Sequence, residues 1–165
     1  MIIEAGQVFP TTRLMRLEKG IVRDHLTSEL FHKGTHLILG FPGAFSPVCD
    51  NQHLPSFVAN ADHILTQGVD TITGISVNDP WVIDVWEKHS GCTDKIALYS
   101  DGNADLAKSL GLEFNDASLG IGVRSHRYVI VVTNGIIKRI KYDRGMQVCM
   151  ATDYEHTADD LSVSS

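Results

Sequence analysis

The sequence lacks long apolar runs, an excess of positive charge and a dense set of cysteines. Its 165 residues carry a formal net charge of −6 and contain only three cysteines. No apolar stretch approaches the ~20 residues that a membrane-spanning helix requires. Lysine and arginine are scattered, so no basic stripe is available to follow a phosphate backbone. We therefore expect neither a membrane span nor a nucleic-acid partner.

The first residues also lack the features of a secretory signal. Residues 1–6 have no basic start and no long apolar segment, which favours a cytoplasmic protein. The chain length and a hydrophobic content of 43% suit one globular domain with a full core. We predict a single domain over residues 1–165.

The cysteines are Cys49, Cys92 and Cys149, an odd and widely spaced set without a C-x-x-C pair. This spacing argues against both a disulfide framework and a zinc site. The eight histidines form no H-E-x-x-H motif, so we expect no metal. A disulfide in this chain is more plausible as a catalytic intermediate than as a permanent link.

Short apolar runs alternate with segments of helical spacing, a pattern that favours a central sheet covered by helices. We expect one helix from Leu54 onward and a second that is capped by Asn78 or Asp79. A third helix is expected to contain Leu106 and to end at Gly111. The predicted strands that precede these helices are residues 35–41, 71–77 and 96–99.

The C-terminal half changes this order. Residues 127–132 and 136–141 are predicted strands, and the Asn134-Gly135 pair between them is a strong signal for a tight hairpin. The prediction is therefore an α/β fold with a mixed sheet. Residues 10–34 suggest short strands or a hairpin, and the tail after Cys149 a terminal helix or frayed chain.

Cys49 stands in a favourable position for a reactive thiol. If Ser46 is the N-cap and Pro47 the first helical residue, Cys49 falls in the first turn, whose backbone N–H groups have no partner within the helix. These donors and the helix dipole stabilise a thiolate and lower the pKa of a cysteine below ~8.5. The alternative is a small buried apolar residue without a chemical role.

Pro42, Ser46 and Cys49 reproduce the signature P-x-x-x-[T/S]-x-x-C of the peroxiredoxins. Matching blocks follow in order at residues 76–81, 100–103 and 120–128. Over about residues 9–141 the chain resembles the type II, or peroxiredoxin-5-like, group. This resemblance implies a thioredoxin-like fold and a thiol peroxidase that reduces hydrogen peroxide and organic hydroperoxides through a cysteine sulfenic acid, with no cofactor.

The resemblance also implies residue roles. Cys49 is the peroxidatic cysteine, the Ser46 hydroxyl interacts with the peroxide and the thiolate, and Pro42 shields the pocket from water. Arg124 is expected to hold the sulfur as thiolate and to orient the peroxide oxygens, because its guanidinium offers several donors in a fixed fork. Threonine is commoner than serine at position 46, and serine lacks its χ1 stiffness.

Recycling of the sulfenic acid needs a second thiol. Cys149 resembles the C-terminal resolving cysteine of animal members, whereas Gly74 occupies the place that plant members use, and many bacterial relatives have none. We place reduction by glutathione with glutaredoxin slightly ahead of resolution by Cys149, with thioredoxin as another candidate reductant. Cys92 is expected to have no catalytic task.

The sequence also bears on two rival functions and on the assembly state. A thioredoxin-like disulfide reductase is set aside, because Gln52 stands where its second cysteine belongs. A non-enzymatic redox sensor or chaperone-like module would use the same oxidisable cysteine to change partners. Relatives commonly form homodimers around the active site, where Phe45 and Trp81 are candidate contacts.

Overall fold

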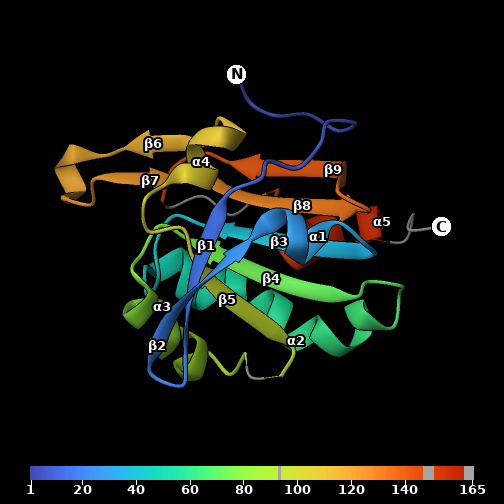
Figure 1. Cartoon of the computed structure of the whole chain (residues 1–165), viewed down its shortest axis with the longest axis horizontal. Coiled ribbons are helices and arrows are strands. Elements are labelled where there is room, and N and C mark those ends of the chain that lie inside the picture. The colour runs from blue at the N-terminus through green and yellow to red at the C-terminus, as the bar shows by residue number, and fades with distance from the viewer. Residues whose placement is uncertain (93, 147–150, 162–165) are drawn as a thin grey trace.

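The computed structural model describes residues 1–92, 94–146 and 151–161, and is built on one seven-stranded mixed sheet (Figure 1). The strand order is β2-β1-β5-β4-β3-β8-β9. Within it, β3, β4 and β5 run parallel, and β1, β2, β8 and β9 join through antiparallel pairs. The strand bounds are β1 Arg13–Glu18, β2 Ile21–Leu26, β3 Thr35–Phe41, β4 Thr71–Ser76, β5 Ile96–Ser100, β8 Arg127–Thr133 and β9 Ile136–Asp143.

Helices cover both faces of the sheet. One apolar cluster joins α2 (Leu54–Leu65) and α3 (Pro80–His89) to one face, and the first residue of α5 (Tyr154–Leu161) packs against it. A second cluster joins α1 (Thr27–Phe31) and α4 (Asp105–Leu110) to the other face. The predicted α/β architecture with a mixed sheet is therefore confirmed.

Strand β3 lies at the centre because every residue from Thr35 to Phe41 is buried. Leu37 and Leu39 face the α2 side, while Ile38 faces the α4 side, as the alternation of side chains along a strand requires. Gly40 is needed in this strand, since a Cβ there would lie 1.9 Å from the ring of Tyr128 on β8. Close contact between these two strands thus depends on glycine.

Most predicted element boundaries agree with the structure. The strand over residues 35–41 has the expected bounds, and Asp79 caps α3 by accepting a hydrogen bond from the Val82 amide. Asn134 and Gly135 both have positive φ, at 50° and 80°, as the tight β8–β9 hairpin requires. Residues 10–34 form the β1–β2 hairpin and the one-turn helix α1, and the tail forms α5.

Two features were not predicted. A π-helical turn, η1 (Cys49–His53), precedes α2, and a small antiparallel sheet pairs β6 (Glu113–Asn115) with β7 (Val123–Ser125) around the 3-10 turn η2 (Ala117–Leu119). The β6–β7 arm projects from the edge of the molecule (Figure 1). Within the described ranges, no helix combines the length and apolarity that spanning a bilayer demands.

Candidate active site

Cys49 lies at the carboxyl end of the central strands. The chain leaves β3 at Phe41, crosses a short loop and enters a helical turn at Pro47, so Cys49 is its third residue, as predicted. The backbone amide of Asp50 donates to the Ser46 carbonyl at 2.8 Å, which fixes this first turn. Ligand sites of open α/β sheets commonly form at this edge.

The loop before Cys49 is held by its own hydrogen bonds and by Asn78, which follows the end of β4. The Ser46 hydroxyl donates to the Gly43 carbonyl at 2.7 Å, so the predicted cap residue is in place but its side chain holds the loop. The Asn78 side-chain oxygen accepts from the Ala44 amide at 2.9 Å. Phe45 has a φ of 63°, a conformation that is costly for a side chain of this size and that the loop contacts maintain.

Arg127 makes the decisive contact with the cysteine. This arginine is fully buried at the start of β8, and its Nη1 donates to the Cys49 Sγ at 3.0 Å. Its Nη2 donates to the Met146 carbonyl at 3.0 Å. An always-charged guanidinium against the sulfur stabilises negative charge that develops there during a reaction.

The family resemblance implied this contact for Arg124, and the structure corrects that expectation. Within the described part of the chain, the Arg124 guanidinium donates to the Ile121 carbonyl at 3.0 Å and to the Pro42 carbonyl at 3.4 Å, not to the sulfur. Arg124 is nevertheless close enough for its charge to interact with Cys49. Burial lowers the pKa of Arg124, and the Cys49 sulfur opposes that shift.

His53 is a second site residue that the sequence analysis missed. Its Nδ1 lies 3.2 Å from Nη1 of Arg127, and its buried ring packs against the rings of Phe41 and Phe57. Burial and the charge of Arg127 lower the pKa of His53 well below its usual value, so the ring is neutral. Since arginine only donates, Nδ1 accepts and the ring proton resides on Nε2.

The alternation of side chains along β8 is a sequence signal that indicates Arg127 as the residue facing Cys49. Arg127 shares its parity with Val129 and Val131, both in the apolar cluster that contains Cys49. Residues of one parity point to one face of a strand, so Arg127 belongs to the Cys49 side. Arg124 lies on β7, beyond the break between the two strands at His126, where this alternation no longer applies.

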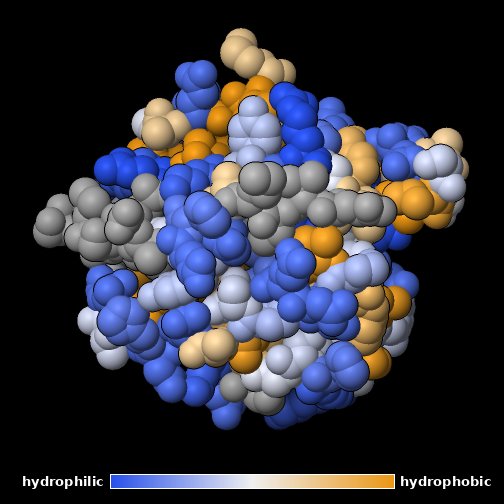
Figure 2. All heavy atoms as spheres, turned by 180° about the vertical axis from the view of Figure 1, so that it is seen from behind, coloured by the Kyte–Doolittle hydropathy of each residue, from blue (hydrophilic) through white to orange (hydrophobic). Residues whose placement is uncertain are grey.

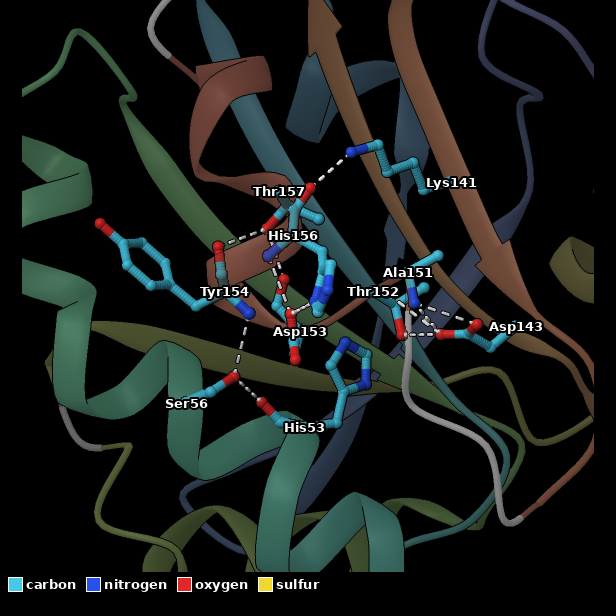
Figure 3. Close-up of polar contacts among 10 residues, drawn as sticks. All are labelled: His53, Ser56, Lys141, Asp143, Ala151, Thr152, Asp153, Tyr154, His156 and Thr157. Atoms are coloured by element: carbon cyan, nitrogen blue, oxygen red, sulfur yellow. Dashed lines mark hydrogen bonds and ion pairs between the residues drawn. The ribbon is translucent and has the colours of Figure 1, made fainter.

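The helix that carries Cys49 is anchored to its surroundings at two levels, and Figure 3 shows the second of these, where Ser56 contacts Tyr154. Asp50 accepts a hydrogen bond from the indole Nε1 of Trp86 at 2.9 Å. Farther along, the Ser56 hydroxyl accepts from the Tyr154 amide at 3.3 Å, which ties α2 to the start of α5.

The segment before α5 is held to the sheet as well. Asp143 on β9 accepts from the backbone amide and the hydroxyl of Thr152, at 3.1 and 2.7 Å.

Of the two other cysteines, the structure describes the surroundings of Cys92 only. Cys92 is buried in the apolar core, and desolvation, reinforced by Glu87, raises the pKa of its thiol from 9.0 to about 12. Cys149, the candidate resolving cysteine, lies outside the described residues. Among the residues that are described, no group of three or more histidine, cysteine or acidic side chains is placed to hold a metal ion.

A mixed sheet between helices, with a cysteine sulfur held by arginine in the first turn after β3, defines a thioredoxin-like protein with a redox-active cysteine. Comparison with known proteins agrees. The Redoxin family model matches residues 4–155. The structure of reduced Prx3 in complex with H2O2 from Vibrio vulnificus superposes with a TM-score of 0.90 and 32% identity, covering 97% of this chain and 99% of that one.

Sequence relatives carry peroxiredoxin names. Putative peroxiredoxin-A of Candida boidinii is 35% identical over 156 residues, which cover 91% of this chain and 93% of the relative. Peroxiredoxin-2E, chloroplastic, of Arabidopsis thaliana is 36% identical over 147 residues, 87% of this chain. The chain belongs to the peroxiredoxins of the Redoxin family, and to their type II, or peroxiredoxin-5-like, kind. It spans about 63% of the length of the Arabidopsis relative.

Proposed function

We propose that this protein is a thiol-dependent peroxidase in which Cys49 reduces hydrogen peroxide and organic hydroperoxides. One observation carries the proposal: the guanidinium of Arg127 donates to the Cys49 sulfur at 3.0 Å inside the first turn of a helix. Both features stabilise negative charge on sulfur, and the thiolate is the nucleophilic form of cysteine. Membership of the peroxiredoxins supports the same reaction.

In the proposed reaction, the Cys49 thiolate attacks one oxygen of the peroxide. An S–O bond forms, the O–O bond breaks, and the leaving oxygen takes up a proton and departs as water or alcohol. The sulfur is thereby oxidised by two electrons to sulfenic acid. Arg127 stabilises the charge that builds on the leaving oxygen, and Ser46 supplies a hydroxyl beside it. Pro42, which is buried, shields the pocket, and no cofactor takes part.

We propose reduction of the sulfenic acid by glutathione, with glutaredoxin, ahead of an internal disulfide with Cys149; thioredoxin is another candidate reductant. An internal disulfide requires the two Cα atoms to come within ~7 Å of each other. The turn that carries Cys49 is tied to its surroundings through Asp50 and, farther along, Ser56, so its displacement has a cost. A small thiol avoids that cost by coming to the sulfur.

The test of the function is turnover with excess hydrogen peroxide and dithiothreitol. A peroxidase consumes many equivalents of peroxide, whereas a redox sensor or chaperone-like module is oxidised once and stops. Consumption of a single equivalent would contradict the proposal.

Mass spectrometry of the protein after one equivalent of peroxide and glutathione tests the recycling route. A glutathione adduct on Cys49 supports our preference. A Cys49–Cys149 disulfide in high yield would overturn it. If thioredoxin then reduces that disulfide and glutathione does not, thioredoxin is the reductant.

We also propose a homodimer formed through apolar residues beside the site. Phe45 and Trp81, the predicted contacts, are 42% and 60% exposed. Leu119 and Val123 on the β6–β7 arm add exposed apolar surface, and apolar atoms on that projecting arm stand out from a mainly hydrophilic face in Figure 2. Sedimentation of the protein and of Trp81→Glu tests this proposal: a dimer that the variant does not weaken would contradict it.

A further inference from the structure

A groove of about 440 Å³ opens beside the Cys49 site, at the carboxyl ends of β4 and β5. Arg124 and Ile121 lie in its wall, together with Asn78, Ser100 and Asn103. The edge where parallel strands end is the usual binding edge of an open α/β sheet. The groove therefore has the place of a ligand site, and the reaction at the sulfur does not account for it.

Arg124 is the one cation among the described residues that line this groove, and Asp79 is the one carboxylate. No carboxylate forms an ion pair with Arg124 within the described ranges, and its hydrogen bonds to the Ile121 and Pro42 carbonyls leave donors unused. These two contacts fix the orientation of the guanidinium. A fixed, partly buried guanidinium with unused donors suits the bidentate binding of a carboxylate.

Asn78 provides a second fixed donor. Its side-chain oxygen accepts from the Ala44 amide at 2.9 Å and from the Ser76 hydroxyl at 2.6 Å. The NH2 group of the same amide therefore points away from these partners, and Asn78 lines the groove. Asp79 also lines the groove, but its carboxylate is engaged as the cap of α3, where it accepts from the Val82 amide, whereas Arg124 has donors to offer an anion.

The charge of the site changes during the proposed reaction. In the proposed reaction the attacking Cys49 sulfur carries a negative charge, which Arg127 contacts and with which Arg124 interacts at longer range. Sulfenic acid is neutral, so oxidation removes this negative charge while both guanidinium groups stay. Attraction for an anion is therefore greatest when the reducing thiol has to arrive.

We propose that this groove binds the carboxylate of a small thiol that reduces oxidised Cys49, with Arg124 and Asn78 as the donors. The inference rests on the peroxidase function proposed above and names the chemical class of the reductant, which glutathione represents. The thiolate attacks the sulfenic sulfur, an S–S bond forms, and the S–O bond breaks as the hydroxyl takes up one proton and leaves as water. A second thiol releases reduced Cys49 and a disulfide.

The test compares 3-mercaptopropionate with its methyl ester as reductants of the oxidised full-length protein. Cys49 is oxidised with one equivalent of hydrogen peroxide, and its reduction is followed by stopped-flow tryptophan fluorescence, with both rates expressed per thiolate. We expect a preference for the carboxylate of about tenfold, the size of one hydrogen bond to a charged group. The preference should fall as salt is added.

Arg124→Gln should reduce the preference to about one, and Arg124→Lys, which keeps the charge and loses the fork, should give an intermediate value. Arg23→Gln is the matched control, because it removes the same charge from an exposed position on β2. A preference that survives in both Arg124 variants overturns the proposal. If Arg124→Gln fails to fold by circular dichroism, Arg124→Lys decides.

A second arm compares a fatty-acid hydroperoxide with its methyl ester in the oxidation step. If the carboxylate preference appears there and is absent from the thiol step, the groove serves the oxidising substrate and the thiol proposal is wrong. Failure of the peroxidase function looks different: no hydroperoxide oxidises Cys49 at all. The two failures are thus separated by the first mixing experiment.

Discussion

Cys49 and Cys92 are both fully buried and belong to the same apolar cluster, yet their surroundings are opposite in charge. Cys49 stands in the first turn of a helix with the guanidinium of Arg127 on its sulfur. Cys92 follows the end of α3, where desolvation, and to a smaller degree the carboxylate of Glu87, raises the pKa of its thiol to about 12. Burial alone therefore does not decide whether a cysteine reacts. The groups that contact the sulfur, such as the Arg127 guanidinium at Cys49, contribute as well.

The largest expected difference between the two cysteines is in catalysis. Cys49→Ser should abolish peroxide turnover, because it removes the nucleophile while keeping a small side chain of similar shape. Cys92→Ser should keep nearly full activity, since its thiol faces the core. Peroxide consumption with dithiothreitol measures both, and retained turnover in Cys49→Ser would contradict the central assignment.

Alkylation of Cys92 tests how far its surroundings suppress the thiolate form. A pKa of about 12 in place of 9.0 leaves about one-thousandth of the ordinary thiolate at pH 8. Folded Cys49→Ser should therefore react with iodoacetamide at Cys92 about a thousandfold more slowly than the unfolded protein, and faster as pH rises toward 12. Peptide mass spectrometry measures the rate. Equal labelling of folded and unfolded protein would show that Cys92 is not protected.

Arg127→Lys tests the charge at Cys49. Lysine keeps the positive charge and loses the fork that reaches both the Cys49 sulfur and the Met146 carbonyl. We expect the second-order rate with hydrogen peroxide to fall about a hundredfold, from loss of ~3 kcal/mol of charged hydrogen bonding. Arg124→Lys should lower the same rate less than tenfold. A larger loss in Arg124→Lys would restore the role first predicted for Arg124.

The smallest expected effect concerns Ser46. Ser46→Ala removes the hydroxyl that holds the Gly43 carbonyl, and the peroxide rate should fall about tenfold, the size of one hydrogen bond in a buried site. Ser46→Thr keeps the hydroxyl and stiffens χ1, so its rate should stay within about twofold of the parent. Stopped-flow oxidation measures both variants. An alanine variant as fast as the parent would remove Ser46 from the mechanism.

Much of the fold was predictable because its signals are local. The run over residues 35–41, the Asp79-Pro80 helix start and the Asn134-Gly135 turn each specify a backbone conformation through their own side chains. The π-helical turn after Val48 and the β6–β7 arm carry no comparable signal. Short strands of three residues and a local change of helical hydrogen bonding depend on packing with distant parts of the chain.

The sequence by itself determined the order of elements, the position of Cys49 in a first helical turn and the family signature around it. Tertiary structure decided which arginine reaches the sulfur. Arg124 and Arg127 are three positions apart, but they lie on different strands, and only the pairing of β8 with β3 carries Arg127 over the helix that contains Cys49. Local sequence specifies backbone conformation, whereas contacts between residues 78 positions apart depend on strand pairing, which a short motif does not encode.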